Sequence, residues 1–133
     1  MINGTMSRPV TPVLLLDEGQ ASSLDALAAS VCIFGAGRFE LRYASDLDSL
    51  RQMASDLAGA HAEALVVVDA DGNPEPKDLL ARAADMGFPL VVLSDGRDDA
   101  IHDHALSVGA AAYLLSELPA RALVDRLEAL SIS

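Results

Sequence analysis

The stretch "EALVVVDADGNPEP", residues 63–76, decides the fold. Its apolar run, Leu65 to Val68, leads into a turn sequence rich in Gly, Asn and Pro, which is typical of a short strand. Because the run does not alternate polar with apolar residues, both faces of the strand should be covered, as in the middle of a parallel sheet. Asp69 and Asp71 follow it directly. Ligands of open α/β sheets bind beyond the carboxyl ends of the strands, so these carboxylates mark a candidate site.

Length and composition predict one compact domain. The chain has 133 residues, of which 51% are hydrophobic and 22% charged, and this balance is typical of a globular protein. We expect a flexible leader over residues 1–11 and a folded domain over residues 12–131. Twenty acidic residues against nine basic ones give a formal net charge of −11, which would repel nucleic-acid phosphates and anionic membrane surfaces. We therefore expect neither as a direct partner.

Isolated residues add little chemistry. The single cysteine, Cys32, lies in an apolar stretch and is interpreted as a small core residue, which fits a reducing, cytoplasmic location. No apolar run approaches the roughly 18 residues typical of a membrane span, and the start of the chain lacks a signal-peptide profile. His102 and His104 lie two positions apart, where helical side chains face different sides, so we interpret them as solvated helix residues.

Five short apolar runs alternate with stretches that have apolar residues at helical spacing. The predicted strands are Val13–Leu16, Phe39–Tyr43, Leu65–Val68, Leu90–Leu93 and Ala112–Leu115. The predicted helices are Ser22–Phe34, Leu47–Ala58, Pro76–Met86, Asp99–Val108 and Pro119–Leu130. The second run, "FELRYA", alternates polar with apolar residues, as an edge strand should. Strands that alternate with helices predict an α/β fold, a three-layer α/β/α sandwich around a parallel sheet of five strands.

Polar residues follow three of these strands: Asp17 and Glu18, Asp69 and Asp71, and Ser94 and Asp95. If the three strands are neighbours, their carboxyl ends meet at one edge of the sheet. Carboxylates about 5 Å apart repel one another by roughly 3 kcal/mol at an effective dielectric of 20, which a divalent cation relieves. Mg²⁺ prefers oxygen ligands and keeps several waters, so such a site would also accept a phosphoryl group.

Four segments, in this order, resemble the receiver domain of two-component response regulators. "VLLLDE" is similar to the first strand and its acidic pair, and "ALVVVDAD" to the third strand, which ends in the phosphoacceptor. "PLVVLSDG" is similar to the fourth strand with its Ser/Thr switch, and "ALSVGAAAYLLSELPARAL" to the segment from the switch aromatic to the last helix. The resemblance implies a flavodoxin-like sheet with strand order 2-1-3-4-5.

The resemblance also implies a metal site and a phosphoacceptor. Asp17 and Glu18 would bind Mg²⁺, Asp69 would accept the phosphoryl group and ligate the metal, and the backbone carbonyl of Asp71 would complete the shell. The implied function is signal transduction through a sensor histidine kinase or phosphotransfer protein and a downstream effector. Catalysis would extend no further than self-catalysed phosphotransfer and autodephosphorylation, so the chain is not expected to be an enzyme.

The switch residues implied by the resemblance are Ser94, which would bond a phosphoryl oxygen, and Tyr113, which would report its position. One family residue is absent, because the lysine that follows the fifth strand is replaced here by Ser116. The only lysine in the chain is Lys77, and Arg97 is the candidate substitute cation. Losing a charge-assisted contact in a partly desolvated site should cost about 1.5–3 kcal/mol, so phosphorylation should be weaker or poorly coupled to output.

Two other functions start from the same residues. The first is a pseudo-receiver, in which the fold serves as a docking or dimerisation module without phosphate, supported by Ser116 and the apolar stretch from Ala105 to Leu115. The second is a phosphatase, because "VVVDADG" and "VVLSDG" are also similar to motifs of haloacid-dehalogenase-like enzymes. Those enzymes usually begin with the nucleophile strand and need a later lysine, whereas here two strands come first and no lysine follows Lys77.

Overall fold

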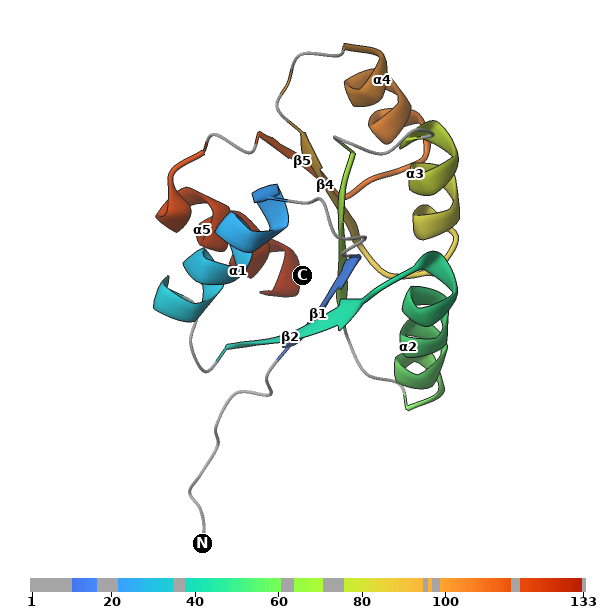
Figure 1. Cartoon of the computed structure of the whole chain (residues 1–133), viewed down its shortest axis with the longest axis horizontal. Coiled ribbons are helices and arrows are strands. Elements are labelled where there is room, and N and C mark those ends of the chain that lie inside the picture. The colour runs from blue at the N-terminus through green and yellow to red at the C-terminus, as the bar shows by residue number, and fades with distance from the viewer. Residues whose placement is uncertain are drawn as a thin grey trace, which may run out of the picture.

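The computed structural model describes residues 11–16, 22–34, 38–60, 64–70, 76–94, 96, 99–115 and 118–132. Within them, strands and helices alternate strictly along the chain (Figure 1). The strands are β1 (Thr11–Leu16), β2 (Phe39–Ala44), β3 (Leu65–Asp69), β4 (Leu90–Ser94) and β5 (Ala112–Leu115). The helices are α1 (Ser22–Phe34), α2 (Leu47–Gly59), α3 (Pro76–Ala84), α4 (Asp99–Ser107) and α5 (Ala120–Ile132).

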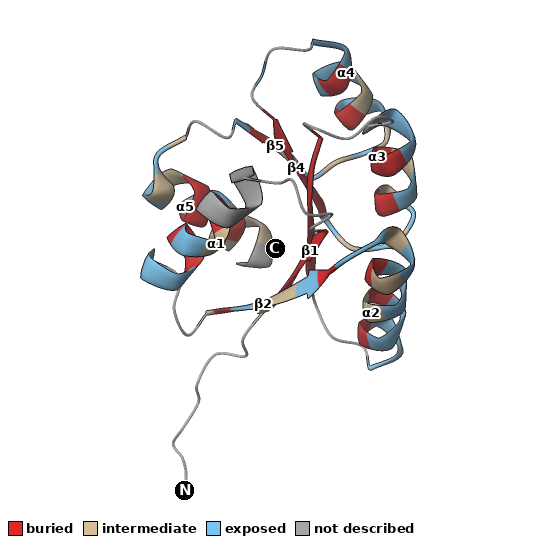
Figure 2. Ribbon diagram, in the orientation of Figure 1, coloured by how far each residue is buried: buried red, intermediate tan, exposed pale blue. Residues whose placement is uncertain are grey.

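The five strands form one parallel sheet in the order β2-β1-β3-β4-β5. Helices α1 and α5 cover one face, and α2, α3 and α4 cover the other (Figure 1). This arrangement confirms the predicted three-layer sandwich and its strand order. β3 and β4 are buried at every position, whereas the edge strand β2 is buried only at its two ends, Phe39 and Ala44 (Figure 2). The predicted alternation of β2 is therefore not observed, since Tyr43 is exposed.

The core consists of two apolar layers, one on each side of the sheet, because successive strand residues point to opposite faces. In β1 and β3 the odd-numbered residues belong to the layer formed with α1 and α5, which contains Val67, Leu27 and Leu127. The even-numbered residues belong to the layer formed with α2, α3 and α4, which contains Val66 and Leu80. The two layers fix the register of every strand, since a slip of one residue would exchange them.

Several boundaries differ from the predicted ones by one or two residues, for local reasons. β3 runs one residue further, through Asp69, because the amide of Ala70 still donates to the carbonyl of Leu93 at 2.9 Å. Helix α5 begins at Ala120 and not at Pro119, whose carbonyl accepts the amide of Leu123 at 3.1 Å. That proline therefore caps the helix from outside its first turn.

Helix α2 begins with a side-chain cap. The Oδ1 atom of Asp46 accepts a hydrogen bond from the backbone amide of Ser49 at 2.7 Å, which is the usual N-cap geometry. This hydrogen bond holds the pKa of the exposed Asp46 carboxyl below its ordinary value. The cap sets the start of α2 directly after the edge strand β2.

The interpretation of Cys32 as a core residue was wrong. Helix α1 buries Leu27, Ser30 and Val31, which lie at helical spacing on one stripe, and Cys32, one position after Val31, falls outside that stripe. Cys32 is exposed, as are its neighbours Ile33 and Phe34. Nowhere in the described ranges is a helix both long enough and apolar enough to cross a membrane.

Candidate functional site

Asp69 ends the central strand β3, at the carboxyl edge of the sheet. Its residue surface is only 8% exposed, and it is one of a few buried polar residues in the described part of the chain. Its Cα is paired with that of Leu93 on β4, and the ladder continues to Ala70. Strand β4 therefore holds the backbone both before and after the aspartate. A strand end held in this way fixes where the carboxylate starts, as a reacting group requires.

Ser94 ends the neighbouring strand β4 and is 1% exposed. Because Leu93 is the partner of Asp69, Ser94 lies one residue further along β4. In the alternation of the strands, Asp69 continues the row that packs with α1 and α5, and Ser94 the row on the opposite face. A group contacted by both side chains must therefore lie above the edge of the sheet.

The turn after β4 is held by Ser94 and Gly96. The Oγ atom of Ser94 accepts a hydrogen bond from the amide of Gly96 at 3.2 Å. Gly96 has a φ of +80°, in the left-handed region that favours glycine, and a Cβ placed there would lie 2.7 Å from Cδ2 of Leu115. The glycine thus allows the chain to turn sharply beside the serine hydroxyl.

We expect Gly96→Ala to lower the free energy of unfolding by about 1–2 kcal/mol, because an L side chain is strained at this φ. The close Leu115 atom is the end of a half-exposed side chain that can move, so relief of the contact in Gly96→Ala/Leu115→Ala should recover little. Gly59→Ala, in a helix with no atom within 4 Å of the new Cβ, is the control and should not destabilise. Urea denaturation of the three variants measures these differences. An unfolding free energy of Gly96→Ala equal to that of the wild type would show that an L side chain is not strained at this position.

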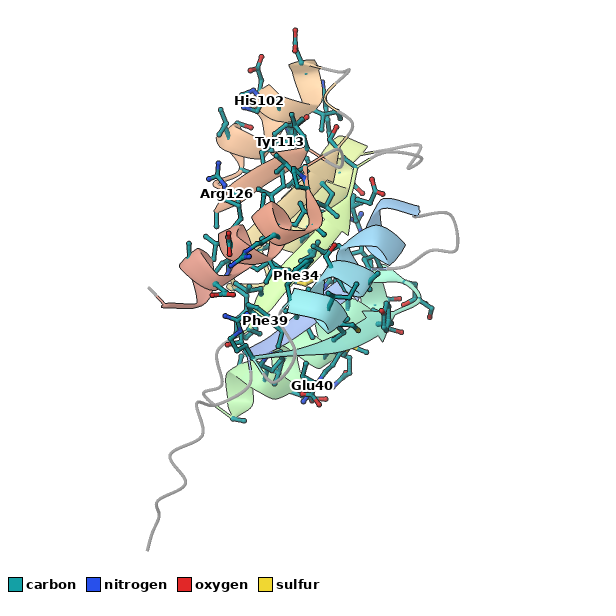
Figure 3. All side chains as sticks on the ribbon, turned by 90° about the vertical axis from the view of Figure 1, so that its left-hand side faces the viewer. Phe34, Phe39, Glu40, His102, Tyr113 and Arg126 are labelled. Atoms are coloured by element: carbon teal, nitrogen blue, oxygen red, sulfur yellow. The ribbon has the colours of Figure 1, made fainter. Side chains whose placement is uncertain are left out.

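Tyr113 lies on β5, with its Cα paired to Val92 on β4. The residue is half-buried, and its hydroxyl is buried without a hydrogen-bond partner among the described residues. The ring of His102, on α4, meets the tyrosine ring edge-on, with a centroid separation of 4.8 Å and an interplanar angle of 65° (Figure 3). The phenol therefore joins β5 to α4 through ring packing, and its polar end remains available for a bond.

The interpretation of both histidines as simply solvated was incomplete. They do face different sides of α4, as their spacing predicts. His102 is exposed but packs against Tyr113, and the Nε2 atom of His104 lies 2.9 Å from the carbonyl of Lys77, at the start of α3. Each histidine links α4 to a neighbouring element, a role that spacing along one helix does not reveal.

The other predicted site residues, Asp17, Glu18, Asp71 and Ser116, lie outside the described residues, as does the candidate substitute cation Arg97. The structure does describe the strands that come directly before Asp17 and Ser116 in the sequence. β1 ends at Leu16 beside β3, and β5 ends at Leu115, whose Cα partner is Ser94. Among the residues that the structure describes, no group of three or more His, Cys, Asp or Glu side chains could hold a metal ion.

Comparison with solved structures gives matches over nearly the whole chain. A response regulator from Thermotoga maritima superimposes with a TM-score of 0.69 and 20% identity, covering 94% of this chain and 100% of that one. A CheY-like receiver domain protein from Methanospirillum hungatei has a TM-score of 0.69 and 19% identity, covering 93% and 96%. The chain has the receiver-domain fold. The observed strand order confirms the fold that the four receiver-like segments of the sequence imply, and β3 ends at Asp69.

A third receiver-fold match is a response regulator from Burkholderia pseudomallei, whose structure contains a phosphorylated aspartic acid, a calcium ion and citrate. It has a TM-score of 0.62 and 19% identity, and the match covers 92% of this chain and 72% of that one. No protein-family model and no curated protein matches the sequence of this chain. At these identities the similarity to receivers is one of fold.

Proposed function

We propose that the chain is a receiver module that accepts a phosphoryl group on Asp69 and acts through regulated protein–protein interaction. The supporting observation is the buried carboxylate of Asp69 at the carboxyl end of a central strand, with Ser94 at the same edge. The phosphorylated aspartic acid of the Burkholderia pseudomallei response regulator supports the same chemistry. The receiver fold favours this function over a haloacid-dehalogenase-like phosphatase.

The proposed reaction is transfer from a phosphohistidine or a small phosphodonor. An oxygen of the Asp69 carboxylate forms a bond to phosphorus while the bond from phosphorus to the imidazole nitrogen breaks, and the leaving imidazole takes up a proton from water. The products are an aspartyl phosphate and a neutral histidine. Bound Mg²⁺ would neutralise charge on the phosphoryl oxygens. Asp17, Glu18, Asp69 and the carbonyl of Asp71 would hold it, since all four supply the oxygen ligands that Mg²⁺ prefers.

Ser94 and Tyr113 would convert the modification into a surface change. Ser94, whose Oγ accepts the amide of Gly96, would donate its hydroxyl proton to a phosphoryl oxygen. Movement of the turn after β4 would alter the packing of Tyr113 against His102. Because His102 belongs to α4, the exposed surface of that helix would change as well. The proposed partners are a sensor histidine kinase or phosphotransfer protein, a downstream effector and a second copy of the chain in a homodimer.

One observation favours a pseudo-receiver as the second candidate function. The position after β5 holds Ser116, and the only lysine, Lys77, is exposed at the start of α3 and forms no ion pair within the described ranges. An aspartyl phosphate would therefore lack the ammonium contact that the receiver resemblance implies. In this second function the fold docks with a partner constitutively.

Amide NMR of the full chain, titrated with MgCl₂ and then with beryllofluoride, tests the proposal. Beryllofluoride mimics a phosphoryl group on a carboxylate, so saturable shifts should appear near Asp69 and Ser94 and extend to Tyr113 and His102. Magnesium alone should shift the amides around Asp17 and Asp69 and leave those of Tyr113 and His102 unchanged. Silence to both additions, with a dispersed spectrum, would reject the phosphoacceptor and leave the pseudo-receiver.

A further inference from the structure

A groove of about 420 Å³ lies between α2 and α3, on the face opposite α1 and α5. One wall is a single stripe of α2, in which Arg51, Ala54 and Ala58 follow one another at helical spacing. The other wall comes from Arg82 near the end of α3 and from the half-buried Met86 in the turn that follows it. The volume suits one or two side chains of a bound partner.

The groove carries positive charge on an acidic protein. Of the nine basic residues in a chain of formal charge −11, Arg51 and Arg82 both line it. Arg82 donates from Nε to Asp78 at 3.0 Å, one helical turn earlier, and its side chain remains 55% exposed. The Arg51 side chain is exposed and has no ion pair or hydrogen bond within the described ranges. Both guanidiniums can therefore reach a ligand placed between the helices.

The groove extends away from the candidate phosphoryl site. Helices α2 and α3 return from the carboxyl edge of the sheet toward its amino edge, as crossover helices of a parallel sheet do. Ala58 belongs to the last turn of α2, and Met86 precedes β4 by only a few residues. Asp69 and Ser94 lie at the opposite ends of their strands. Occupation of the groove does not require contact with the Asp69 carboxylate.

The lining selects the chemistry of the occupant. Two guanidiniums separated by an apolar floor favour carboxylates that are spaced along a chain, with an apolar side chain between them. Asp85 also lines the groove and would repel a compact ligand of high negative charge, such as a run of phosphates. The overall negative charge likewise opposes nucleic acid.

We propose that the α2–α3 groove docks a short acidic segment of a partner protein, with glutamate or aspartate side chains at Arg51 and Arg82 and an apolar side chain over Met86. This docking is independent of phosphorylation at Asp69. At 0.1 M salt, the repulsion between the acidic protein and the acidic segment is screened beyond about 10 Å. The ion pairs that Arg51 and Arg82 form with the segment act over shorter distances and persist at this salt concentration. The segment should therefore bind at that ionic strength.

Amide NMR with a blocked eight-residue peptide of alternating glutamate and leucine, in 0.1 M NaCl, tests the docking. The peptide should produce saturable shifts at Arg51, Ser55 and Met86, and its glutamine–leucine counterpart should produce none. Arg51→Gln should raise the dissociation constant about 1.5- to 5-fold, the range of an exposed ion pair. Arg51→Glu should raise it further, by like-charge repulsion.

Arg121→Glu, an equal charge change at an exposed position of α5, is the matched control and should leave the affinity within twofold. Shifts outside the groove, equal losses in Arg51→Glu and Arg121→Glu, or equal binding of the glutamine peptide would each overturn the proposal. Inorganic phosphate is titrated in parallel, and displacement of the peptide by phosphate at equal concentration would mean a simple anion site. The Asp69→Asn protein should bind the peptide normally, so this test fails or succeeds separately from the phosphoacceptor.

Discussion

Asp69→Asn is expected to abolish both phosphorylation and the response to beryllofluoride. Asparagine has the shape of aspartate, but its amide nitrogen replaces one oxygen, and the neutral group has no anionic oxygen to attack phosphorus. It also removes one of the charges that would hold Mg²⁺. Incubation with acetyl phosphate and Mg²⁺ should therefore add one phosphoryl group to the wild-type chain and none to the variant, as measured by intact mass.

Asp125→Asn, at an exposed position of α5, is the control and should be phosphorylated like the wild type. The Asp69 variant should also retain the fold, because exchanging a buried carboxylate for a neutral amide of equal size does not create a cavity or an unpaired charge. Thermal denaturation checks this point. Phosphorylation of the folded Asp69→Asn chain would place the acceptor elsewhere and remove the central residue of the proposed function.

The sheet could be predicted because its information is local. The runs around Leu14, Val67 and Val92 lack alternation, so each had to be covered on both faces, and the helical stretches between them fixed a parallel arrangement. The strand ends were less predictable, since they depend on single hydrogen bonds between strands. The amide of Ala70 extends the ladder past Asp69, and nothing in the residues around it requires that.

Contacts between different helices and strands could not be predicted from the sequence, because they depend on how these elements pack. Arg51 and Arg82 have the spacing of ordinary solvated helix residues, and only the packing of α2 beside α3 turns both toward one groove. The ring of His102 meets Tyr113 because α4 lies over β5. Cys32 was misplaced because an apolar helical stretch does not show which stripe faces the sheet when its exposed side is apolar too. For the candidate site, sequence order brought Asp69 and Ser94 to one edge, but the turn glycine Gly96 emerged only from its φ.

Ser116→Lys is expected to tighten beryllofluoride binding by about 10- to 150-fold, the equivalent of a charge-assisted hydrogen bond of about 1.5–3 kcal/mol. The register supports the position. Leu115, the residue before it in the sequence, is paired with Ser94, the serine that is proposed to contact the phosphoryl group. An ammonium supplied from there would add the contact that the present chain lacks and would stabilise the phosphorylated state relative to the free one.

The measurement is a beryllofluoride titration at saturating Mg²⁺, followed by amide NMR, on the wild type, Ser116→Lys and Ser116→Met. Methionine extends the side chain without charge, so it separates an electrostatic gain from a change in packing and should leave the affinity near that of the wild type. The lysine variant should also hold its phosphoryl group longer after acetyl phosphate is removed. Equal affinities in all three proteins would mean that another cation already contacts the site, and Arg97→Gln would then be the variant that loses binding. A wild type that ignores beryllofluoride and a lysine variant that binds it would instead assign the present chain to phosphate-independent docking, with the serine as the residue that disables the receiver.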